Sequence, residues 1–224
     1  IQLTYSTLAA FSKYPHESSL KHRIEGRKSQ KKYGFFQSEA YYFDELAKAL
    51  GLNQLAQDEK SWVRHPLAFL VEAADDICYH IIDLEDGSRL GWVPFEQARD
   101  LMAAILGDAY MPEKLENTKD ENDKISYLRA LAINTLITQC VDVFLENEDE
   151  ILKGEFDKAL MDLVPCKKVL REIIDVSIDK IYRSNLVLET EAVGHTVLEG
   201  LMQAFIKAAI GQKGAEESSK KNLK

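Results

Sequence analysis

A sixteen-residue stretch from Glu72 to Gly87 (EAADDICYHIIDLEDG) contains six carboxylic acids and no lysine or arginine. Carboxylates at this density could bind a divalent cation, or they could pair with basic groups from elsewhere in the fold. With about 100° per residue, Asp75, Tyr79 and Asp83 form an i, i+4, i+8 line in a sector about 80° wide that also holds Glu72 and Asp86. A solvated helix face is the plainer alternative, but such faces usually mix signs, because like charges four residues apart destabilise a helix.

A basic segment could neutralise this acidic stretch. Lys21 to Gly34 (KHRIEGRKSQKKYG) contains six lysines and arginines, opposed only by Glu25. Such a segment fits a solvated loop, but it also fits a polyphosphate clamp, because lysine and arginine bind phosphate oxygens through charge and donor geometry. An acidic helix beside a basic loop would suit a ligand that combines a metal ion with a triphosphate.

The elements that must position these residues are helices. Apolar residues recur with helical spacing through most of the chain, and no alternating strand pattern interrupts them, so we predict an all-α fold. Pro66 fits a first helical turn, and Gly51 and Gly87 fit helix ends. The spacing predicts helices over 38–50, 66–86, 95–106, 123–151, 156–164, 166–185 and 187–210, with polar loops at 15–34 and 107–122.

The composition narrows the class of protein. With 46% hydrophobic residues in 224, the chain can bury a core, and its net charge of −9 argues against a protein that coats nucleic acid. Its apolar runs look shorter than a membrane span, so we expect no membrane partner. The three cysteines are far apart, which favours a reduced, cytoplasmic location. Of the single residues, Cys78 should be a buried thiol and His80 a partly exposed helix residue.

Four stretches of the chain resemble a known family. They are LTYSTLAAFSKYP (3–15), KKYGFFQSE (31–39), RHPLAFLVEAADDICYHIIDLEDG (64–87) and YLRALAINTLI (127–137). Their order and residues are similar to those of the deoxyguanosinetriphosphate triphosphohydrolases, a branch of the HD-domain metal-dependent phosphohydrolases, and the third stretch is the most specific. The resemblance implies a multi-helix HD-domain-like bundle. Residues 1–151 would be part of the catalytic domain, 152–210 a C-terminal helical region and 211–224 a flexible tail.

The resemblance also implies roles for individual residues. Asp75 matches the last metal ligand of the family, and Tyr79 and Asp83 match the residues that line the deoxyribose. Lys13 and Tyr14 of the KYP sequence match substrate-binding residues, Lys32 matches a phosphate-binding lysine, and Arg129 is a less secure phosphate contact. We therefore expect Asp75, Tyr79 and Asp83 to face a ligand cavity that they share with Lys13 and Lys32.

One part of the family pattern is absent. The family's first metal-binding histidine and its histidine–aspartate pair have no counterpart, since none of the five histidines precedes an aspartate. We expect this chain to be an internal piece of a longer enzyme that, alone, binds metal poorly and is inactive, because one carboxylate cannot fix a metal's geometry. The metal implied for the parent is manganese, magnesium, iron or cobalt.

The expected activity is hydrolysis of dGTP, or of other deoxynucleoside triphosphates, to a deoxynucleoside and inorganic triphosphate. A metal-activated water would attack the α-phosphorus, and a homo-oligomer is implied. The alternative from a different class is a nucleotide-sensing or single-stranded nucleic-acid-binding protein on the same scaffold, without turnover. A plain helical scaffold is a third interpretation. A histidine and a later histidine–aspartate pair upstream of Ile1 would distinguish the enzyme from the binding protein.

Overall fold

The computed structural model describes residues 2–19, 23–56, 59–116 and 118–221, and within these ranges the fold is all-α, as predicted. The regular elements are helices, and the only β-pairing in the described residues is three isolated bridges. The chain divides into two compact units, Ile1–Ser177 and Ile178–Lys224. The expected division after residue 151 stays a prediction.

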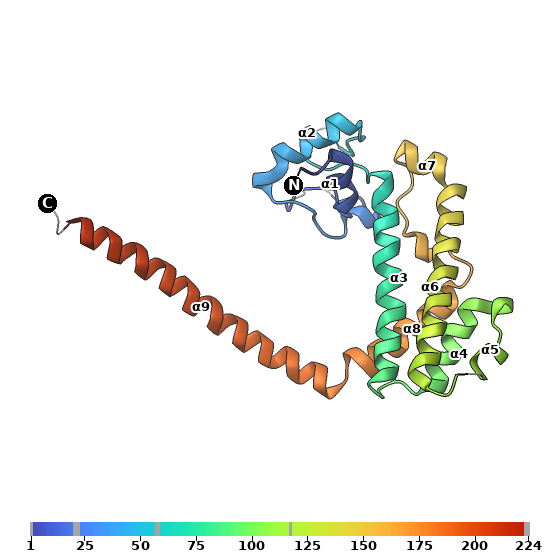
Figure 1. The fold of residues 1–224 in the computed structure, drawn as a ribbon. Coiled ribbons are helices and arrows are strands. Elements are labelled where there is room, and N and C mark those ends of the chain that lie inside the picture. The colour runs from blue at the N-terminus through green and yellow to red at the C-terminus, as the bar shows by residue number, and fades with distance from the viewer. Residues whose placement is uncertain (1, 20–22, 57–58, 117, 222–224) are drawn as a thin grey trace. The chain divides into compact units, whose positions relative to one another are not determined.

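The first unit contains most of the helices (Figure 1). Its α-helices are α1 (Tyr5–Phe11), α2 (Ala40–Leu50), α3 (Pro66–Arg89), α4 (Phe95–Leu106), α5 (Glu113–Glu116), α6 (Glu121–Glu146), α7 (Glu148–Lys153) and α8 (Lys167–Val176). Short 3-10 helices join them: η1 (Lys28–Gln30), η2 (Gln37–Glu39), η3 (Gly107–Ala109) and η4 (Leu160–Asp162).

Helix α3 carries the acidic stretch and lies at the centre of the first unit. It begins at Pro66, and the His65 side chain caps it by accepting a hydrogen bond from the Leu67 amide (3.2 Å). It packs against α1, α4, α6, α8 and η4, and it lies alongside α6 (Figure 1). Its apolar side, including Phe69, Ile77 and Ile81, is buried, so packing rather than helix propensity fixes which side of α3 faces the core.

Helix α6 corrects the expectation that every apolar run is too short to cross a membrane. It has 26 residues, and its most apolar 18-residue window has a mean hydropathy of 1.4. By length and composition alone it could span a bilayer, and among the described residues it is the one helix that could. It packs against α3 and α4, however, and buries Ile125, Leu128 and Leu136 there. Part of its apolar surface therefore belongs to the core of the first unit.

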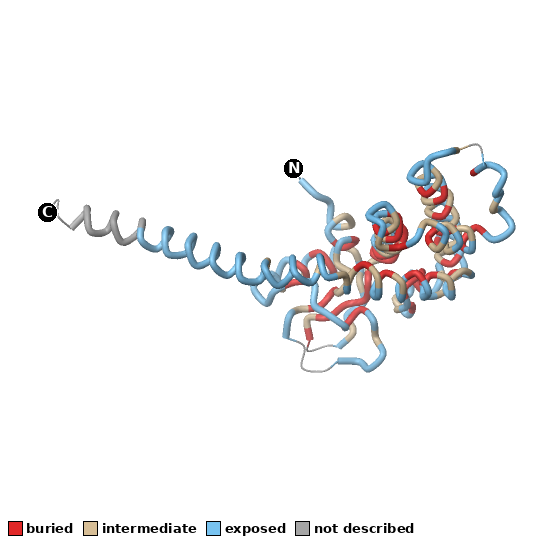
Figure 2. The backbone as a smooth tube through the Cα atoms, turned by 90° about the horizontal axis from the view of Figure 1, so that it is seen from below, coloured by how far each residue is buried: buried red, intermediate tan, exposed pale blue. Residues whose placement is uncertain are grey.

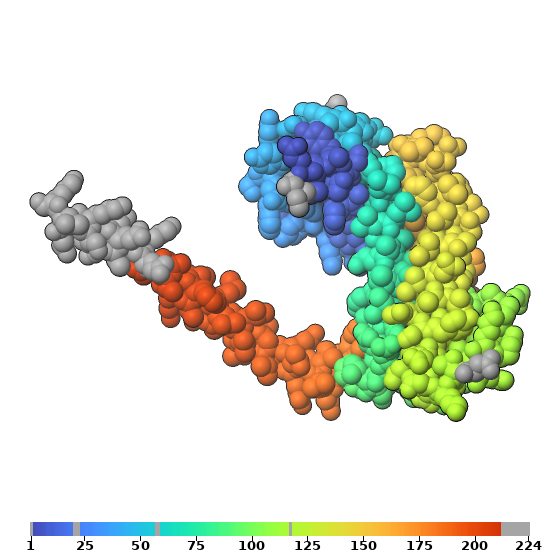
Figure 3. Space-filling view, viewed as in Figure 1, coloured from blue at the N-terminus to red at the C-terminus, as the bar shows by residue number. Residues whose placement is uncertain are grey.

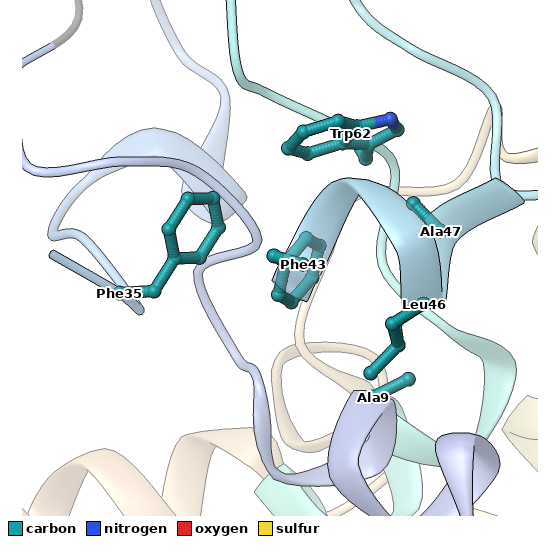
Figure 4. Packing of buried hydrophobic residues seen from close by; sticks show 6 residues of the cluster. All are labelled: Ala9, Phe35, Phe43, Leu46, Ala47 and Trp62. Carbon is teal, nitrogen blue, oxygen red and sulfur yellow. The ribbon is translucent and has the colours of Figure 1, made fainter. Parts of the chain in front are cut away.

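The segment around α1 and α2 has its own apolar cluster (Figure 4). Phe35 stacks on Phe43 with ring centroids 4.5 Å apart, and the Trp62 ring lies 5.3 Å from that of Phe43. The remaining members are Ala9, Leu46 and Ala47. This cluster ties α1 and α2 to the chain entering α3, and so it holds the KYP sequence near the start of the acidic helix.

Several predicted boundaries are wrong. The expected helix over 123–151 is two helices, because the chain leaves helical geometry at Asn147. The expected helix over 156–164 forms only the short η4 turn, and that over 166–185 ends as α8 before a π-helical segment, η5 (Ser177–Tyr182). The error at 156–164 arises because a short apolar run does not distinguish a helix from an irregular buried segment. The other two errors concern where a long helix ends, and helical spacing alone does not fix that position.

The second unit consists mainly of α9 (Asn185–Lys221), which continues through most of the segment expected to be a flexible tail. None of residues 185–211 is buried (Figure 2). Residues 222–224, the end of the expected tail, lie outside the described residues.

Candidate functional site

A cavity of about 420 Å³ opens in the first unit beside α3. Its lining comes from four parts of the chain: the KYP sequence after α1, the basic segment at η1, the start and one side of α3, and the η4–α8 region. The charged and polar residues that line it are Lys13, Tyr14, Lys28, Lys31, Arg64, Glu72, Asp76, His80, Asp162, Lys167 and Arg171. Cations therefore outnumber carboxylates two to one in this lining.

A buried ion-pair network forms one wall of the cavity. Arg64, only 3% exposed, donates from Nη1 to Glu72 Oε2 (2.9 Å) and from Nε to the Lys13 carbonyl oxygen (2.8 Å). Lys13 Nζ lies 3.1 Å from the other Glu72 oxygen. A buried carboxylate requires such partners, since an isolated buried charge is very unfavourable. The first acid of the acidic stretch is thus neutralised by two cations, one of them directly from the KYP sequence.

The network and its burial shift the pKa values of Asp76 and Lys13, and both shifts are upward. Burial raises the pKa of Asp76, and Lys13 offsets only part of that effect. Burial is the largest single influence on Lys13 and would lower its pKa, but Glu72, Asp76 and Tyr14 together outweigh burial, and the net direction is upward. Lys13 is therefore held as a cation, while Asp76 takes up a proton more readily than an exposed aspartate.

The basic segment reaches the cavity only in part. Lys28 and Lys31 line it, as the clamp interpretation predicts, and Lys28 forms an ion pair with Asp162. Lys32, the lysine that the resemblance selects, is exposed and does not line the cavity. Lys21 lies outside the described residues. Within the KKYG turn, the structure thus brings the first lysine, and not the second, to Lys13 and Tyr14.

The line formed by Asp75, Tyr79 and Asp83 does not face this cavity. Asp75 and Tyr79 are exposed, Asp83 is partly exposed, and none of the three lines it. The expectation that they share a cavity with Lys13 and Lys32 in this chain is therefore wrong. A neighbouring line on α3 does line the cavity. It has the same i, i+4, i+8 spacing and consists of Glu72, Asp76 and His80.

The exposed side of α3 includes further residues. Cys78 is exposed, which corrects the expectation of a buried thiol, and Leu67 and Val71 lie on the same side. In Figure 3 the atoms of α3 and α6 lie next to each other at the surface. The roles that the resemblance implies for Asp75, Tyr79 and Asp83 stay predictions, and they concern this exposed side of α3.

Arg129 neutralises a second buried acid of the acidic stretch. Its Nη1 donates to Glu85 Oε2 (3.0 Å), and Arg89 Nη2 lies 3.0 Å from Glu85 Oε1. Glu85 is only 2% exposed, so both arginines compensate its charge. Arg129 does not line the cavity, and its role as a phosphate contact stays a prediction.

The described residues do not by themselves fit a metal ion. No group of three or more histidine, cysteine, aspartate or glutamate side chains comes together among them. A divalent ion with defined geometry needs several such ligands, so Asp75 could supply only one of them.

Sequence reasoning missed three cations that line the cavity. Arg64 stands directly before the His-Pro that opens α3 and lies outside the helix, so helical spacing does not relate it to Glu72. Lys167 and Arg171 on α8 carried no signal either, because only the tertiary packing of α8 against α3 and α4 brings them to the cavity.

Curated relatives identify the family. The chain is 39% identical to a deoxyguanosinetriphosphate triphosphohydrolase-like protein of Synechocystis sp. over 213 residues, which cover 94% of this chain and 48% of the relative. It is 33% identical to a protein of the same description from Listeria monocytogenes, covering 94% of this chain and 45% of that relative. The chain belongs to the deoxyguanosinetriphosphate triphosphohydrolase family.

More distant members agree with this family. A deoxyguanosinetriphosphate triphosphohydrolase of Yersinia enterocolitica is 26% identical over 92% of this chain, which corresponds to 43% of that relative. No protein-family model matches the chain. The chain spans about half the length of the curated relatives it matches.

Proposed function

We propose that the protein hydrolyses dGTP, and other deoxynucleoside triphosphates where they fit, to a deoxynucleoside and inorganic triphosphate. The observation that carries this proposal is the meeting of Lys13 and Tyr14 with further cations in one cavity beside α3. Relatives named for this activity support the choice of reaction. A triphosphate carries several negative charges, and clustered lysine and arginine side chains stabilise charge of this kind, in the ground state and as it shifts toward a leaving group.

In this proposal the two sides of α3 have different tasks. The side facing the cavity binds phosphate through Lys13, which the Glu72 carboxylate holds in its charged form. The exposed side carries Tyr79 and Asp83, which would position the sugar, and Tyr79 would exclude a ribose by crowding its 2′-hydroxyl. The two sides adjoin, so a nucleotide could lie across the edge between them.

The family resemblance adds a divalent metal, manganese, magnesium, iron or cobalt, with Asp75 as one ligand. Because the described residues form no metal-binding group, the other ligands of that ion would have to come from residues outside those described. Metal dependence is therefore a property to measure in the complete protein and not in this chain alone.

The test is product analysis with the complete protein. It should be incubated with dGTP in the presence of Mn²⁺ or Mg²⁺, and the phosphate products should be separated by anion-exchange chromatography. The proposal predicts inorganic triphosphate and deoxyguanosine in equal amounts. Release of pyrophosphate or orthophosphate instead, or binding of dGTP without any product, would contradict it, and the second result would favour the nucleotide-sensing alternative.

A further inference from the structure

A second hollow of the first unit lies where α1 meets α2, and its lining comes from α1, the residues around η2, and α2. We call it the α1–α2 groove. Its volume is about 480 Å³, within the range of roughly 300–1,000 Å³ that is usual for small-ligand sites. None of the residues that line it also lines the cavity beside α3, so it is a separate site.

The α1–α2 groove has an aromatic and apolar lining. Phe35, Phe43 and Leu46 are each at most 7% exposed, and they belong to the apolar cluster in which the two phenylalanine rings stack (Figure 4). Tyr5 and Tyr42 also line the groove and stay exposed. Aromatic faces attract ammonium groups, and rings of this size pack against methylene chains. The lining therefore suits a ligand that joins positive charge to a hydrocarbon part.

Two glutamates supply the charge of the groove, and a hydrogen bond holds each of them. Glu39 Oε2 accepts from the Phe36 amide (2.9 Å), and Glu45 Oε1 accepts from the Tyr5 hydroxyl (2.6 Å). Each of these bonds uses one oxygen, and a carboxylate has a second oxygen with which to accept from a ligand. Among the described residues, no ion pair involves either glutamate, and no lysine, arginine or histidine lines the groove. The complementary ligand is therefore a cation.

The spacing of the two glutamates favours a ligand with two positive charges. Glu39 is the N-cap residue of α2, and Glu45 lies on the second turn of that helix. At 1.5 Å per residue, their Cα atoms are roughly 9 Å apart along the helix axis. Two ammonium groups joined by a methylene chain match such a pair of carboxylates, because the chain can pack on the rings of the groove as the stem of a lysine packs on an apolar surface.

We propose that the α1–α2 groove binds a linear aliphatic diamine or polyamine, with one ammonium group at Glu39, another at Glu45 and the methylene chain against the rings. The proposal does not rest on the proposed hydrolysis, since the groove and the cavity share no lining residue. A ligand bound to both α1 and α2 stabilises their contact by mass action. Because α1 leads directly into the KYP sequence, the bound diamine would also stabilise the segment that brings Lys13 to the cavity.

The experiment measures binding of putrescine to the 224-residue chain by calorimetry at low ionic strength, where the screening of charge is weak. Putrescine should bind. The matched ligand is n-butylamine, which has the same carbon chain and only one ammonium group. It should bind about fivefold more weakly, the upper end of the range for one exposed ion pair.

Glu39→Gln and Glu45→Gln locate the two ammonium groups. Each variant should weaken putrescine binding about fivefold, because one ion pair is lost. Glutamine keeps an oxygen that can accept from the Phe36 amide or the Tyr5 hydroxyl, so the fold should be retained, as circular dichroism would show. Glu96→Gln is the matched control, because Glu96 is an exposed glutamate on α4 that does not line the groove. It should change the affinity less than about twofold.

Tyr42→Leu tests the contribution of the rings. Leucine keeps an apolar side chain but has no aromatic face, so putrescine should bind about threefold more weakly. Tyr41→Leu is the control for this variant, since Tyr41 is the neighbouring residue, is 72% exposed and does not line the groove. Its putrescine affinity should stay close to that of the unmodified chain.

The proposal is overturned if putrescine does not bind at millimolar concentration, if n-butylamine binds as tightly as putrescine, or if the Glu96 control loses as much affinity as the two groove variants. A second copy of the chain is the competing occupant. Self-association that Tyr42→Leu abolishes, with no putrescine bound, would overturn the proposal in favour of that occupant. None of these results depends on turnover of dGTP, so failure of this site is distinguishable from failure of the proposed hydrolysis.

Discussion

Replacing Glu72 by glutamine should destabilise the first unit strongly. Glu72 is 6% exposed and is the carboxylate to which both Arg64 and Lys13 are paired. The substitution leaves Arg64 buried without an opposing charge, and removing one partner of a buried ion pair costs about 3–5 kcal/mol. Because glutamine keeps the volume and one oxygen that can accept from Arg64 Nη1, we expect about 3 kcal/mol, at the lower end of that range.

The measurement is urea unfolding of the 224-residue chain, followed by the fluorescence of the two tryptophans, of which Trp62 is buried in the apolar cluster. In a thermal melt, a loss of about 3 kcal/mol would lower the midpoint temperature by about 6–12 °C for a domain of this size. The matched control is Asp44→Asn, which breaks ion pairs with Lys48 and Lys60, lysines whose side chains are 74% and 43% exposed. Such surface pairs contribute about 0–1 kcal/mol.

The reasoning would be refuted if Glu72→Gln and Asp44→Asn had the same free energy of unfolding within about 0.5 kcal/mol, the scatter of ordinary surface substitutions. That result would mean that Arg64 is solvated or paired in another way. The buried ion-pair network of Arg64, Glu72 and Lys13 would then not form the cavity wall.

Two further substitutions test the surroundings of the cavity. A Cβ at Gly34 would overlap the Tyr14 carbonyl oxygen, so Gly34→Ala should destabilise by about 1–3 kcal/mol in urea, whereas Gly194→Ala, which has open space in α9, should not destabilise. Equal effects would contradict the close approach at Gly34. Because burial raises the pKa of Asp76 above 3.8, its charged form costs folding free energy above that raised pKa, and the cost disappears as the pH falls below 3.8. Asp76→Asn should therefore raise the thermal midpoint near neutral pH, and the gain should fade as the pH falls toward 3.8. A gain that grows in acid would contradict this sign.

The sequence predicts α3 well because several independent signals agree there. Pro66 opens the helix, the apolar side has helical spacing, and the polar residues Asp75, Tyr79 and Asp83 recur every four positions. The same spacing does not say which line faces the cavity, since Glu72, Asp76 and His80 repeat as regularly as Asp75, Tyr79 and Asp83. The packing of Arg64, Lys13 and α8 around α3 decides which line faces the cavity, and helical spacing does not reveal tertiary packing.

The irregular parts of the chain were less predictable for a related reason. Residues 156–164 are apolar enough for a helix, but they form an irregular connection whose Leu160 and Met161 are buried against the core. The basic segment has a composition that indicates phosphate binding, but the composition does not say which lysine reaches the cavity. Lys31 lines the cavity and its neighbour Lys32 does not, and this difference depends on the local backbone path.

The most direct test of the central claim is the release of triphosphate from dGTP by the complete protein carrying Asp75→Ala, measured with Mn²⁺ or Mg²⁺ beside an Asp100→Ala control. Asp100 is an exposed aspartate on α4 and does not line the cavity. The account predicts that the Asp75 variant loses at least about 100-fold in rate, because it lacks one proposed ligand of the ion that would stabilise charge on the reacting phosphate, while the Asp100 variant keeps nearly full activity. Undiminished triphosphate release by the Asp75 variant would contradict it.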